Sequence, residues 1–526
     1  MKVLIADKVS ATCAEVLRRA GFEVEHRPSL SPGELRAAVA DADGLVVRSD
    51  TRVTDEVMAA APRLRVVGRA GAGVDNIDVE AATRRGIVVM NAPGENTISA
   101  AEHTMSMLLS LARRIPAADR SMRAGRWERG STFLGVELSG KTLGVLGLGK
   151  VGREVAARAR AFGMEVIGTD PVLSTEVAAR LGVTLLPLPE ILARADFLTL
   201  HLPLTPETRH LIGRSELARC RRGVRIVNVA RGGVLDEAAL VEALQTGQVA
   251  GAALDVFEQE PPTGSPLLAL ESVVLTPHLG ASTQEAQEKV AARIAEQIAG
   301  FLKEGLVSNA VNMEGVDPRI LPELQPYRVL CERLGQLLAA LAPSSIAEIT
   351  VEFSGSVLDH PTGPLTASLV KGFLQGKLSD PVNAVNVMLL ARESGLRVVE
   401  TRAAESQDFS ALICATVKGR DISRSAGGTL FGKRDPRLVR LDEYHLDAIP
   451  AGPMLIVSND DRPGMVGRIG TVLGNAGVNI AYLSLGRDRS GGRAIAIFNL
   501  DSPLTDEVRK AIAAIDGVLS AERVTL

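Results

Sequence analysis

Residues that mark several classes of protein are scarce in this sequence. Its 526 residues include 4 cysteines, 1 Trp and 3 Tyr, and aromatic residues make up 3% of the chain. Stacking platforms for single-stranded nucleic acid are therefore not expected. The cysteines form no Cys-x-x-Cys pair, which argues against a disulfide framework or a zinc cluster and fits a reducing compartment. They are the widely spaced Cys13, Cys220, Cys331 and Cys414.

Long hydrophobic runs and an excess of one charge are also missing. No apolar stretch reaches the roughly 18 residues of a transmembrane helix, and the short run Val3–Ala6 fits a first β-strand better than a signal-peptide core. The 59 Lys and Arg against 62 Asp and Glu leave a net charge of -3. This balance argues against a general binder of nucleic acid or anionic membranes. We therefore expect a cytoplasmic protein with neither partner.

The chain has the pattern of several globular domains. At roughly 150 residues per domain it has room for about three to four. Short runs of Val and Ile alternate with helix-like stretches up to about Gly140 and again over Thr142–Leu275, which predicts two doubly wound parallel sheets of the Rossmann-like α/β type. Thr97–Arg114 is predicted as one long helix that Pro116 would end or bend. A further helical period over Gln284–Lys303 is expected to cross back to the first domain.

The residue pattern changes after Val316, where the proline-rich stretch Asp317–Tyr327 resembles a linker. Mixed helix and strand patterns follow, and we expect an intervening α+β domain there. The last segment has the order βαββαβ, which predicts a small ferredoxin-like domain. The expected units are 1–97 with 284–315, then 98–283, 316–451 and 452–526.

The strongest local motif is a glycine-rich turn between a predicted strand and a predicted helix. Gly147, Gly149 and Gly152 form a G-x-G-x-x-G pattern directly after the apolar run Leu143–Leu146. Such glycines let the backbone approach a pyrophosphate, and the following helix N-terminus offers free N–H groups. Asp170 ends the next strand, where an acid binds the adenosine ribose and disfavours a 2′-phosphate. This predicts NAD rather than NADP, with a βαβ turn that binds nothing as the alternative.

Three ionisable residues follow successive predicted strands of the second domain. These are Arg231, Glu260 and His278, and the carboxyl ends of parallel strands meet at one crevice. Arg can hold a carboxylate by two parallel hydrogen bonds, His exchanges a proton near neutral pH, and a paired Glu favours the imidazolium. Each residue alone would also fit a loop or turn, and Arg231 could pair with Asp236. Their shared position favours an active site.

These motifs resemble the D-isomer-specific 2-hydroxyacid dehydrogenases, in particular their long form with a C-terminal ACT domain. The similarity covers essentially the whole chain and is carried by VGRAGAGVDNID, LGVLGLGKVGREVA, NVARGGVLDE, GAALDVFEQEPP and PHLGASTQEAQ. The resemblance implies NAD-dependent oxidation of 3-phospho-D-glycerate to 3-phosphooxypyruvate, the first step of L-serine synthesis. It also implies a homo-oligomer, either a dimer or a tetramer.

The resemblance implies roles for single residues as well. Arg231, Glu260 and His278 would be the catalytic set, and no metal is required. Neutral His278 would take the proton of the C2 hydroxyl, Glu260 would stabilise the imidazolium, and Arg231 would bind the carboxylate. The cofactor contacts implied are the glycines Gly147, Gly149 and Gly152, Lys150 and Val151 at the phosphates, Asp170 at the ribose, Asp255 near the nicotinamide amide, and Ala230, His278, Leu279, Gly280 and Ala281 along the nicotinamide.

A phosphorylated substrate needs further cations. Arg48 and Arg69 each follow a strand of the first domain and, with Arg231, are expected to shape an anionic pocket; exposed loop positions are the alternative. The segment Gly71, Ala72 and Gly73 offers backbone N–H donors to the carboxylate or phosphate. The only tryptophan, Trp127, is placed by the resemblance near a dimer contact, with a core position as the alternative.

The segment from Leu455 resembles an ACT domain, a module that pairs through its sheet and binds amino acids at the interface. The resemblance implies an L-serine site formed by Asn459, Asp461 and Asn479; a domain that only dimerises is the alternative. In the intervening region, Lys433, Arg434 and Arg437 would bind an anion such as phosphate or substrate, or would form a charged surface hairpin.

Two other functions share part of this pattern. A glyoxylate or hydroxypyruvate reductase has the same catalytic set and cofactor site but would normally lack the chain after Asn312. A non-catalytic NAD-sensing corepressor, similar to the C-terminal-binding proteins, also keeps the catalytic set but would carry no ACT domain. The C-terminal extension therefore favours the phosphoglycerate enzyme.

Overall fold

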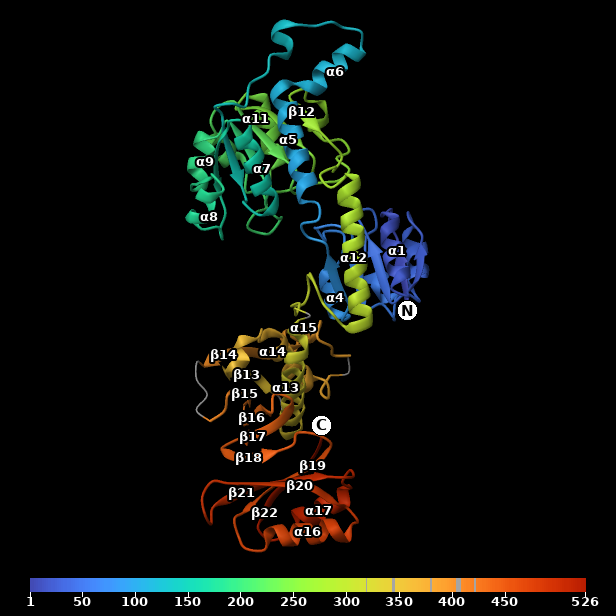
Figure 1. Ribbon diagram of the computed structural model, residues 1–526, viewed down its shortest axis with the longest axis vertical. Helices are drawn as coiled ribbons and strands as arrows, with labels where there is room; N and C mark the ends of the chain where they lie inside the picture. Colours follow the sequence, from blue (N-terminus) through green and yellow to red (C-terminus); the bar gives the residue numbers. More distant parts are fainter. Residues whose placement is uncertain (318, 343–345, 379–380, 404–407, 421) are drawn as a thin grey trace.

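The computed structural model describes residues 1–317, 319–342, 346–378, 381–403, 408–420 and 422–526. They form four β-sheets, and Figure 1 shows the four units one after another along the long axis of the molecule. The second unit lies at one end, the first and third units follow, and the C-terminal unit lies at the other end. Within the described residues, no helix combines the length and apolarity needed to cross a membrane.

The first sheet is parallel and has the strand order β2-β1-β3-β4-β5. The long helix α12 (Gln284–Glu304) packs on it, because Val290, Ile294 and Ile298 share a core with strand residues. Gly68 permits this packing, since a Cβ there would collide with Ile298. The elements are β1 (Lys2–Ile5), α1 (Ala11–Arg19), β2 (Glu23–His26), α2 (Pro32–Val39), β3 (Gly44–Val47), α3 (Asp55–Ala59), β4 (Val66–Arg69), α4 (Val79–Arg84) and β5 (Val88–Asn91).

The second sheet is parallel, with the order β12-β11-β10-β9-β6-β7-β8. Helix α5 (Thr97–Arg113) ends at Arg114 in a left-handed conformation, and Pro116 lies in the first turn of α6 (Ile115–Arg123). The chain direction thus changes where the proline predicted it. The remaining elements are β6 (Thr142–Leu146), α7 (Lys150–Ala161), β7 (Glu165–Thr169), α8 (Thr175–Arg180), β8 (Thr184–Leu185), α9 (Leu188–Arg194), β9 (Phe197–Leu200), α10 (Arg214–Arg219), β10 (Val224–Asn228), α11 (Glu237–Gln245), β11 (Val249–Leu254) and β12 (Val273–Leu275).

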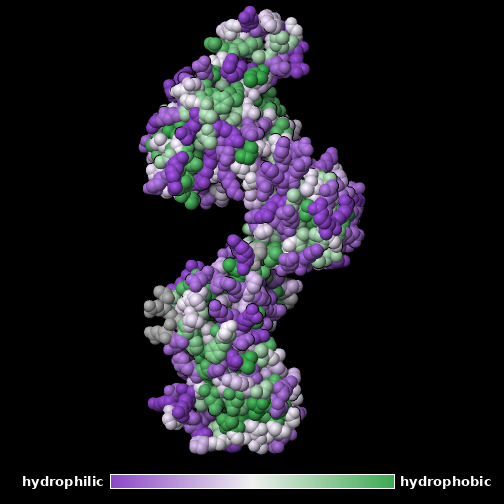
Figure 2. Space-filling model, viewed as in Figure 1, coloured by the Kyte–Doolittle hydropathy of each residue, from purple (hydrophilic) through white to green (hydrophobic). Residues whose placement is uncertain are grey.

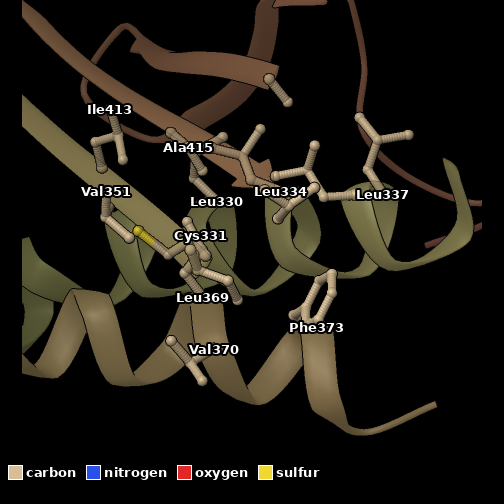
Figure 3. Close-up of a cluster of buried hydrophobic side chains, with 14 of the residues drawn as sticks. Leu330, Cys331, Leu334, Leu337, Val351, Leu369, Val370, Phe373, Ile413 and Ala415 are labelled. Atoms are coloured by element: carbon tan, nitrogen blue, oxygen red, sulfur yellow. The ribbon is translucent and has the colours of Figure 1, made fainter. Parts of the chain in front are cut away.

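The third sheet is mixed, with the order β14-β13-β15-β16-β17-β18. Figure 3 shows its core, where α13 lies between the sheet and α14. Leu330 and Leu334 of α13 lie on the side of the sheet, and Leu369 and Phe373 belong to α14. Gly335 brings the two helices close together, because a Cβ there would overlap the carbonyl oxygen of Leu369. The elements are α13 (Leu321–Leu341), β13 (Ile346–Gly355), α14 (Gly363–Leu374), α15 (Val387–Glu393), β14 (Arg397–Ala403), β15 (Ala411–Gly419), β16 (Ser423–Phe431), β17 (Asp435–Leu441) and β18 (Tyr444–Ala448).

Replacing Gly335 by Ala is expected to destabilise this unit by about 1–3 kcal/mol, because the added methyl group forces two helix backbones apart. The measurement is the thermal unfolding midpoint of the full chain. Gly376→Ala is the matched control, since a Cβ at Gly376 would meet no described atom within 4 Å. Equal midpoints for the two variants would contradict the close packing of α13 on α14.

The linker predicted at Asp317–Tyr327 is wrong from Leu321 onwards, where the chain forms the start of α13. Pro322 lies in the first turn, where a missing N–H costs no helical hydrogen bond. Pro326 stands inside the helix and does remove one. Burial of Leu324 and the following leucines in the core outweighs that loss. Pro318 lies outside the described residues.

The fourth sheet is antiparallel, with the order β20-β21-β19-β22, which is the ferredoxin-like arrangement. One face packs on its two helices through residues such as Leu455 and Ile469. The other face shares the core of the third sheet through Met454 and Ile497. The predicted fold class is therefore confirmed. The elements are β19 (Pro453–Asp460), α16 (Met465–Asn475), β20 (Ile480–Arg487), β21 (Arg493–Leu500), α17 (Asp506–Ala513) and β22 (Val518–Thr525).

Candidate active site

A cleft of about 570 Å³ lies between the first and second sheets. In the second sheet, strands that follow β6 in the chain lie on both sides of it, and ligands of open α/β sheets bind at such a switch point. The cleft brings together five ionisable residues predicted after strands and the three residues of the segment predicted to offer N–H donors. They are Arg48, Arg69, Arg231, Glu260 and His278, with Gly71, Ala72 and Gly73.

His278 and Glu260 form a direct pair at the cleft. Nδ1 of His278 lies 2.8 Å from Oε2 of Glu260, and Oε1 of Glu260 accepts the N–H of Phe257 at 3.1 Å. Burial acts to raise the pKa of Glu260, but its hydrogen bond and charge interaction with His278 outweigh burial and hold that pKa below its ordinary value. The carboxylate therefore stays ionised and orients the imidazole, leaving Nε2 for a reacting group.

Asp255 holds the backbone that carries His278. Its Oδ1 accepts the N–H of Leu279 at 2.7 Å, its Oδ2 accepts that of Gly280 at 2.8 Å, and its carbonyl oxygen accepts that of His278 at 2.8 Å. These bonds stabilise the left-handed backbone of His278, whose φ is 56°. The carboxylate predicted near the nicotinamide amide thus also holds the loop that carries His278.

His103 and Thr276 complete this network, and the sequence assigned no role to either. Both lie within hydrogen-bond distance of Oδ1 of Asp255, at 3.1 Å and 2.5 Å. Burial would raise the pKa of Asp255, whereas the bonds from His103, Thr276 and Leu279 hold it below its usual value. His103 lies on α5, far in the sequence from β11 and Asp255, so no local sequence pattern predicts the contact between His103 and Asp255.

Arg231 faces the cleft from the loop after β10. The amide of Asn228 fixes this loop, since it donates to the carbonyl oxygen of Arg231 at 2.9 Å and accepts the N–H of Ala230 at 3.0 Å. Arg231 Nε lies 3.5 Å from Oδ2 of Asp75, which is largely exposed. A carboxylate ligand that binds Arg231 would therefore displace only this weak, solvated ion pair with Asp75. Asn228 and Asp75 were not predicted.

Arg48 is positioned by the buried carboxylate of Asp7. Oδ2 of Asp7 accepts the N–H of Arg48 at 2.5 Å, and Oδ1 accepts the hydroxyl of Thr51 at 2.5 Å. From the other side, the amide of Asn76 donates to the carbonyl oxygens of Arg48 and Thr51. These long-range bonds fix the backbone of Arg48, which lines the cleft.

Arg69 lies deeper in the cleft. Burial, together with repulsion from Arg231 and Arg48, lowers its pKa to about 10, so it remains protonated at neutral pH. Among the described residues, its buried Nε has no acceptor. A Cβ at Gly71 would overlap Arg69, and one at Gly73 would overlap Arg231, so these glycines make room for the guanidinium groups. Three arginines facing one cleft suit a ligand with more than one negative charge.

The glycine-rich turn fits a dinucleotide. Gly147 has a φ of +92°, and a Cβ at Gly152 would overlap the carbonyl oxygen of Gly147. A Cβ at Gly149 would meet open space, which leaves room for a phosphate at the start of α7. Lys150 and Val151 are the first two residues of this helix. Asp170 accepts three backbone N–H bonds, from Leu148, Val172 and Leu173, so part of its hydrogen-bonding capacity is already used.

The residues predicted along the nicotinamide are not all placed alike. Ala230, Gly280 and Ala281 line the cleft, as does Asp255. Leu279 is exposed and does not line it. Ala72 lines the cleft beside Gly71. The cofactor contacts that this wall offers are therefore mainly those of small residues.

The C-terminal unit has a cleft of about 430 Å³ that Asn459, Asp461 and Arg487 line. Asn479 does not line it and instead donates to Oδ2 of Asp501 at 2.6 Å. Within one chain, the structure thus brings together two of the three residues predicted for a serine site. Oδ2 of Asp461 accepts the N–H of Gly491 at 3.0 Å and lies 3.6 Å from Nη1 of Arg487.

Two further predictions receive different outcomes. The core position considered for Trp127 is wrong, because 75% of its surface is exposed in the segment after α6. Lys433 and Arg434 lie exposed on the β16–β17 hairpin. Arg437 lies 3.6 Å from Oδ1 of Asp447, and its guanidinium covers the ring of Phe431. These residues therefore lie on a charged hairpin, and the anion site predicted there stays a prediction.

Comparisons with known proteins match the chain in separate regions and as a whole. The family described as D-isomer specific 2-hydroxyacid dehydrogenase, NAD binding domain, matches residues 105–280. The D-3-phosphoglycerate dehydrogenase intervening domain matches 323–442, and the ACT domain matches 454–517.

Similar proteins extend over the full length. The D-3-phosphoglycerate dehydrogenase of Archaeoglobus fulgidus is 42% identical, with 100% of both chains covered. That of Mycobacterium tuberculosis is 44% identical over 100% of this chain and 99% of its own. Among solved structures, the TT0316 protein from Thermus thermophilus has a TM-score of 0.54 and 39% identity, and covers 59% of this chain and 100% of its own. A D-lactate dehydrogenase from Aquifex aeolicus, complexed with NAD and lactic acid, has a TM-score of 0.53 and 28% identity, with 59% and 99% covered.

Proposed function

The chain belongs to the D-3-phosphoglycerate dehydrogenases, and from this premise we propose that Arg231, Glu260 and His278 are the residues with which it oxidises its substrate. The reaction is the NAD-dependent oxidation of 3-phospho-D-glycerate to 3-phosphooxypyruvate in serine biosynthesis. The observation that supports these roles is the His278–Glu260 pair, which faces three arginines across one cleft.

In this proposal His278 is the general base. Its Nε2 takes the proton of the C2 hydroxyl, and the imidazolium that forms is stabilised by Glu260 at Nδ1, 2.8 Å away. Arg231 holds the substrate carboxylate and polarises the C2 oxygen. NAD, when bound, supplies the hydride acceptor. Asp255 keeps the imidazole in place by accepting the N–H groups of Leu279 and Gly280, the two residues that follow His278.

Arg48 and Arg69 are proposed to bind the substrate phosphate together with the backbone N–H groups of Ala72 and Gly73. The predicted N–H of Gly71 instead donates to the carbonyl oxygen of Arg69 at 2.8 Å. The buried Nε of Arg69, which has no acceptor among the described residues, supports this assignment, because a buried charged donor without an acceptor is costly until an anion binds. Dianionic phosphate needs more positive charge than Arg231 alone provides. Because Arg231 is assigned to the substrate carboxylate, Arg48 and Arg69 are the arginines of the cleft that remain for the phosphate.

The cofactor contacts are proposed at the glycine-rich turn and along the small residues of the cleft wall. Gly147, Gly149 and Gly152 shape the turn, Lys150 and Val151 present backbone N–H groups to the phosphates, and Asp170 binds the ribose. Ala230, Asp255 and His278–Ala281 are proposed along the nicotinamide side. The carboxylate of Asp170 disfavours a 2′-phosphate, which supports NAD over NADP.

The experiment is an initial-rate assay of the purified full chain with 3-phospho-D-glycerate and either NAD or NADP. The proposal expects reduction of NAD and at least about tenfold lower kcat/KM with NADP, because one repulsive charge contact costs more than about 1.4 kcal/mol. If the enzyme turns over glyoxylate or hydroxypyruvate but not phosphoglycerate, the proposed substrate is contradicted, while the assignment of the fold is unaffected.

The four units are proposed to have separate tasks, with boundaries at 1–97 with 284–315, 98–283, 316–451 and 452–526. The first binds substrate and the second binds NAD. The third is proposed to bind an anion such as phosphate or substrate, and the fourth is regulatory. The buried or half-buried free cysteines support a reducing, cytoplasmic setting.

We also propose that the protein is a homo-oligomer. Trp127 and Met122 are exposed on the arm around α6, and Leu485 and Leu519 are exposed on the fourth sheet. Figure 2 shows hydrophobic residues gathered over the C-terminal unit at the lower end of the molecule. Exposed apolar surface of this kind is typical of subunit contacts. A dimer or tetramer would cover both places.

L-Serine is proposed to bind the cleft of the fourth unit, where Asp461 would meet its ammonium group and Asn459 its carboxylate. Asn479 is proposed to come from a second copy, since in its own chain it lies outside this cleft. Serine bound there would inhibit the enzyme.

Replacing Asp461 by Asn is expected to raise the serine concentration for half-inhibition by about tenfold, because a charge-assisted hydrogen bond is lost. Activity without serine is expected to stay unchanged, since Asp461 lies in a different unit from the catalytic cleft. Glu507→Gln, an exposed change on α17, is the control. Equal inhibition of Asp461→Asn and the unaltered chain would contradict the site.

A further inference from the structure

Besides the catalytic cleft, a second cleft between two units lies where the first unit joins the intervening unit. It has a volume of about 400 Å³ and is called the second cleft below. Its walls come from the segment after α12, from α13, α14 and α15, and from β14. Small-molecule sites have this size and are mostly apolar with a few polar groups. The apolar wall includes Leu306, Val307, Met313, Val385, Met388 and Val398.

Three charged residues line the same cleft, and Glu400 among them is already paired. Oε1 and Oε2 of Glu400 accept the hydroxyls of Thr362 and Thr366 at 2.7 and 2.8 Å. Burial would raise the pKa of Glu400, but these bonds and Arg402 hold it below its ordinary value. Glu400 is therefore an ionised, hydrogen-bonded wall residue and needs no ligand.

Arg328 is different. Its Nε is shielded from solvent and has no acceptor among the described residues, and its Nη1 donates to Oε1 of Gln325 at a long 3.4 Å. A buried donor of a charged group without an acceptor is costly. Carboxylate and phosphate groups are the partners whose geometry an arginine matches best.

Charge on the wall limits the ligand further. Glu314 and Glu400 both line the cleft, so a ligand with two negative charges would meet stronger repulsion than a single carboxylate that pairs with Arg328. We propose that this cleft binds a small monocarboxylate with an apolar body. The carboxylate accepts from Arg328 Nε, and the apolar body packs on Leu306, Met313 and Val398.

The site reaches the catalytic cleft through α12, and this coupling is part of the proposal. Gln287 and Val290, in the first two turns of α12, line the catalytic cleft, whereas Gly305 and Leu306, directly after its last turn, line the second cleft. A helix of 21 residues is a rod about 30 Å long. Since rigid elements carry coupling between sites, occupancy of the second cleft changes the KM for 3-phospho-D-glycerate.

The test measures binding of 4-methylpentanoate to the full chain by isothermal titration calorimetry. Its neutral isostere, 4-methylpentanamide, keeps the shape and removes the charge. We expect the amide to bind about tenfold more weakly, and Arg328→Met to weaken the carboxylate by about the same factor. Arg333→Met changes an arginine of the same helix that does not line the cleft, and binding by this control should be unaltered.

A second variant tests the shape of the cleft without touching the charge. Ala367 lines the cleft on α14, and Ala367→Leu should fill it and abolish binding while the thermal midpoint stays within a few degrees. Absence of carboxylate binding in the unaltered chain, equal binding of acid and amide, or unchanged binding by Arg328→Met would each overturn the site.

The coupling has its own readout. With saturating 4-methylpentanoate, the KM for 3-phospho-D-glycerate should change at least about twofold in the unaltered chain and not in Arg328→Met. Binding that leaves KM unchanged would overturn the coupling through α12.

Discussion

Replacing His278 by Asn is expected to lower kcat for oxidation of 3-phospho-D-glycerate by about 10²–10⁴-fold, the usual contribution of a positioned general base. Asn keeps a polar side chain of similar size but cannot take the C2 proton. Its amide also cannot form the charged pair that His278 makes with Glu260 at 2.8 Å. The measurement is the initial rate of NADH formation at saturating substrate.

The binding of substrate should be much less affected, because the three arginines that line the cleft remain in place. His445→Asn is the matched control, since His445 is exposed on β18 and outside the catalytic cleft. A kcat within about twofold of the unaltered chain would remove His278 from the chemistry. A loss of kcat in His445→Asn would show that the assay reports general damage.

Replacing Arg69 by Met is expected to raise the KM for 3-phospho-D-glycerate by about 10- to 100-fold, because hydrogen bonds to charged groups contribute about 1.5–3 kcal/mol. Arg69 is the most desolvated of the three arginines, and burial lowers its pKa to about 10. Met keeps much of the apolar stem and removes the charge. The measurement is KM and kcat with saturating NAD.

D-Glycerate, which lacks the phosphate, separates the two anion roles. If Arg69 binds phosphate, kcat/KM for D-glycerate should change little in Arg69→Met. An equal loss with both substrates would place Arg69 at the carboxylate instead. Arg36→Met, an exposed change on α2, should leave both substrates unaffected.

Local sequence patterns predicted the elements that build this site. The glycine-rich turn, the strands before Arg231 and His278, and the long helix over Gln284–Lys303 each have a pattern within a few residues, and each forms as expected. Strand β2 was missed because its sequence, Glu-Val-Glu-His, is polar and lies at a sheet edge. No apolar run marks such a strand.

The contacts that position the reactive groups were not predictable from one sequence. Asp7 reaches Arg48, and His103 reaches Asp255, across long stretches of chain, so no periodicity relates the partners. Asp255 itself was predicted as a nicotinamide contact, yet its oxygens also hold the His278 loop. The linker prediction at the start of α13 was wrong for the opposite reason. The local prolines favour a linker, whereas burial of Leu324 in the core stabilises a helix there.

The most direct measurement compares kcat/KM for 3-phospho-D-glycerate and D-glycerate in the unaltered chain. A site built to pair a charged group rejects an analogue that lacks it, because its buried donors are left without partners. Arg48, Arg69 and Arg231 in one cleft therefore predict a preference of about 10⁴-fold for the phosphorylated substrate. Similar values for the two substrates would contradict the assignment of this cleft to phosphoglycerate.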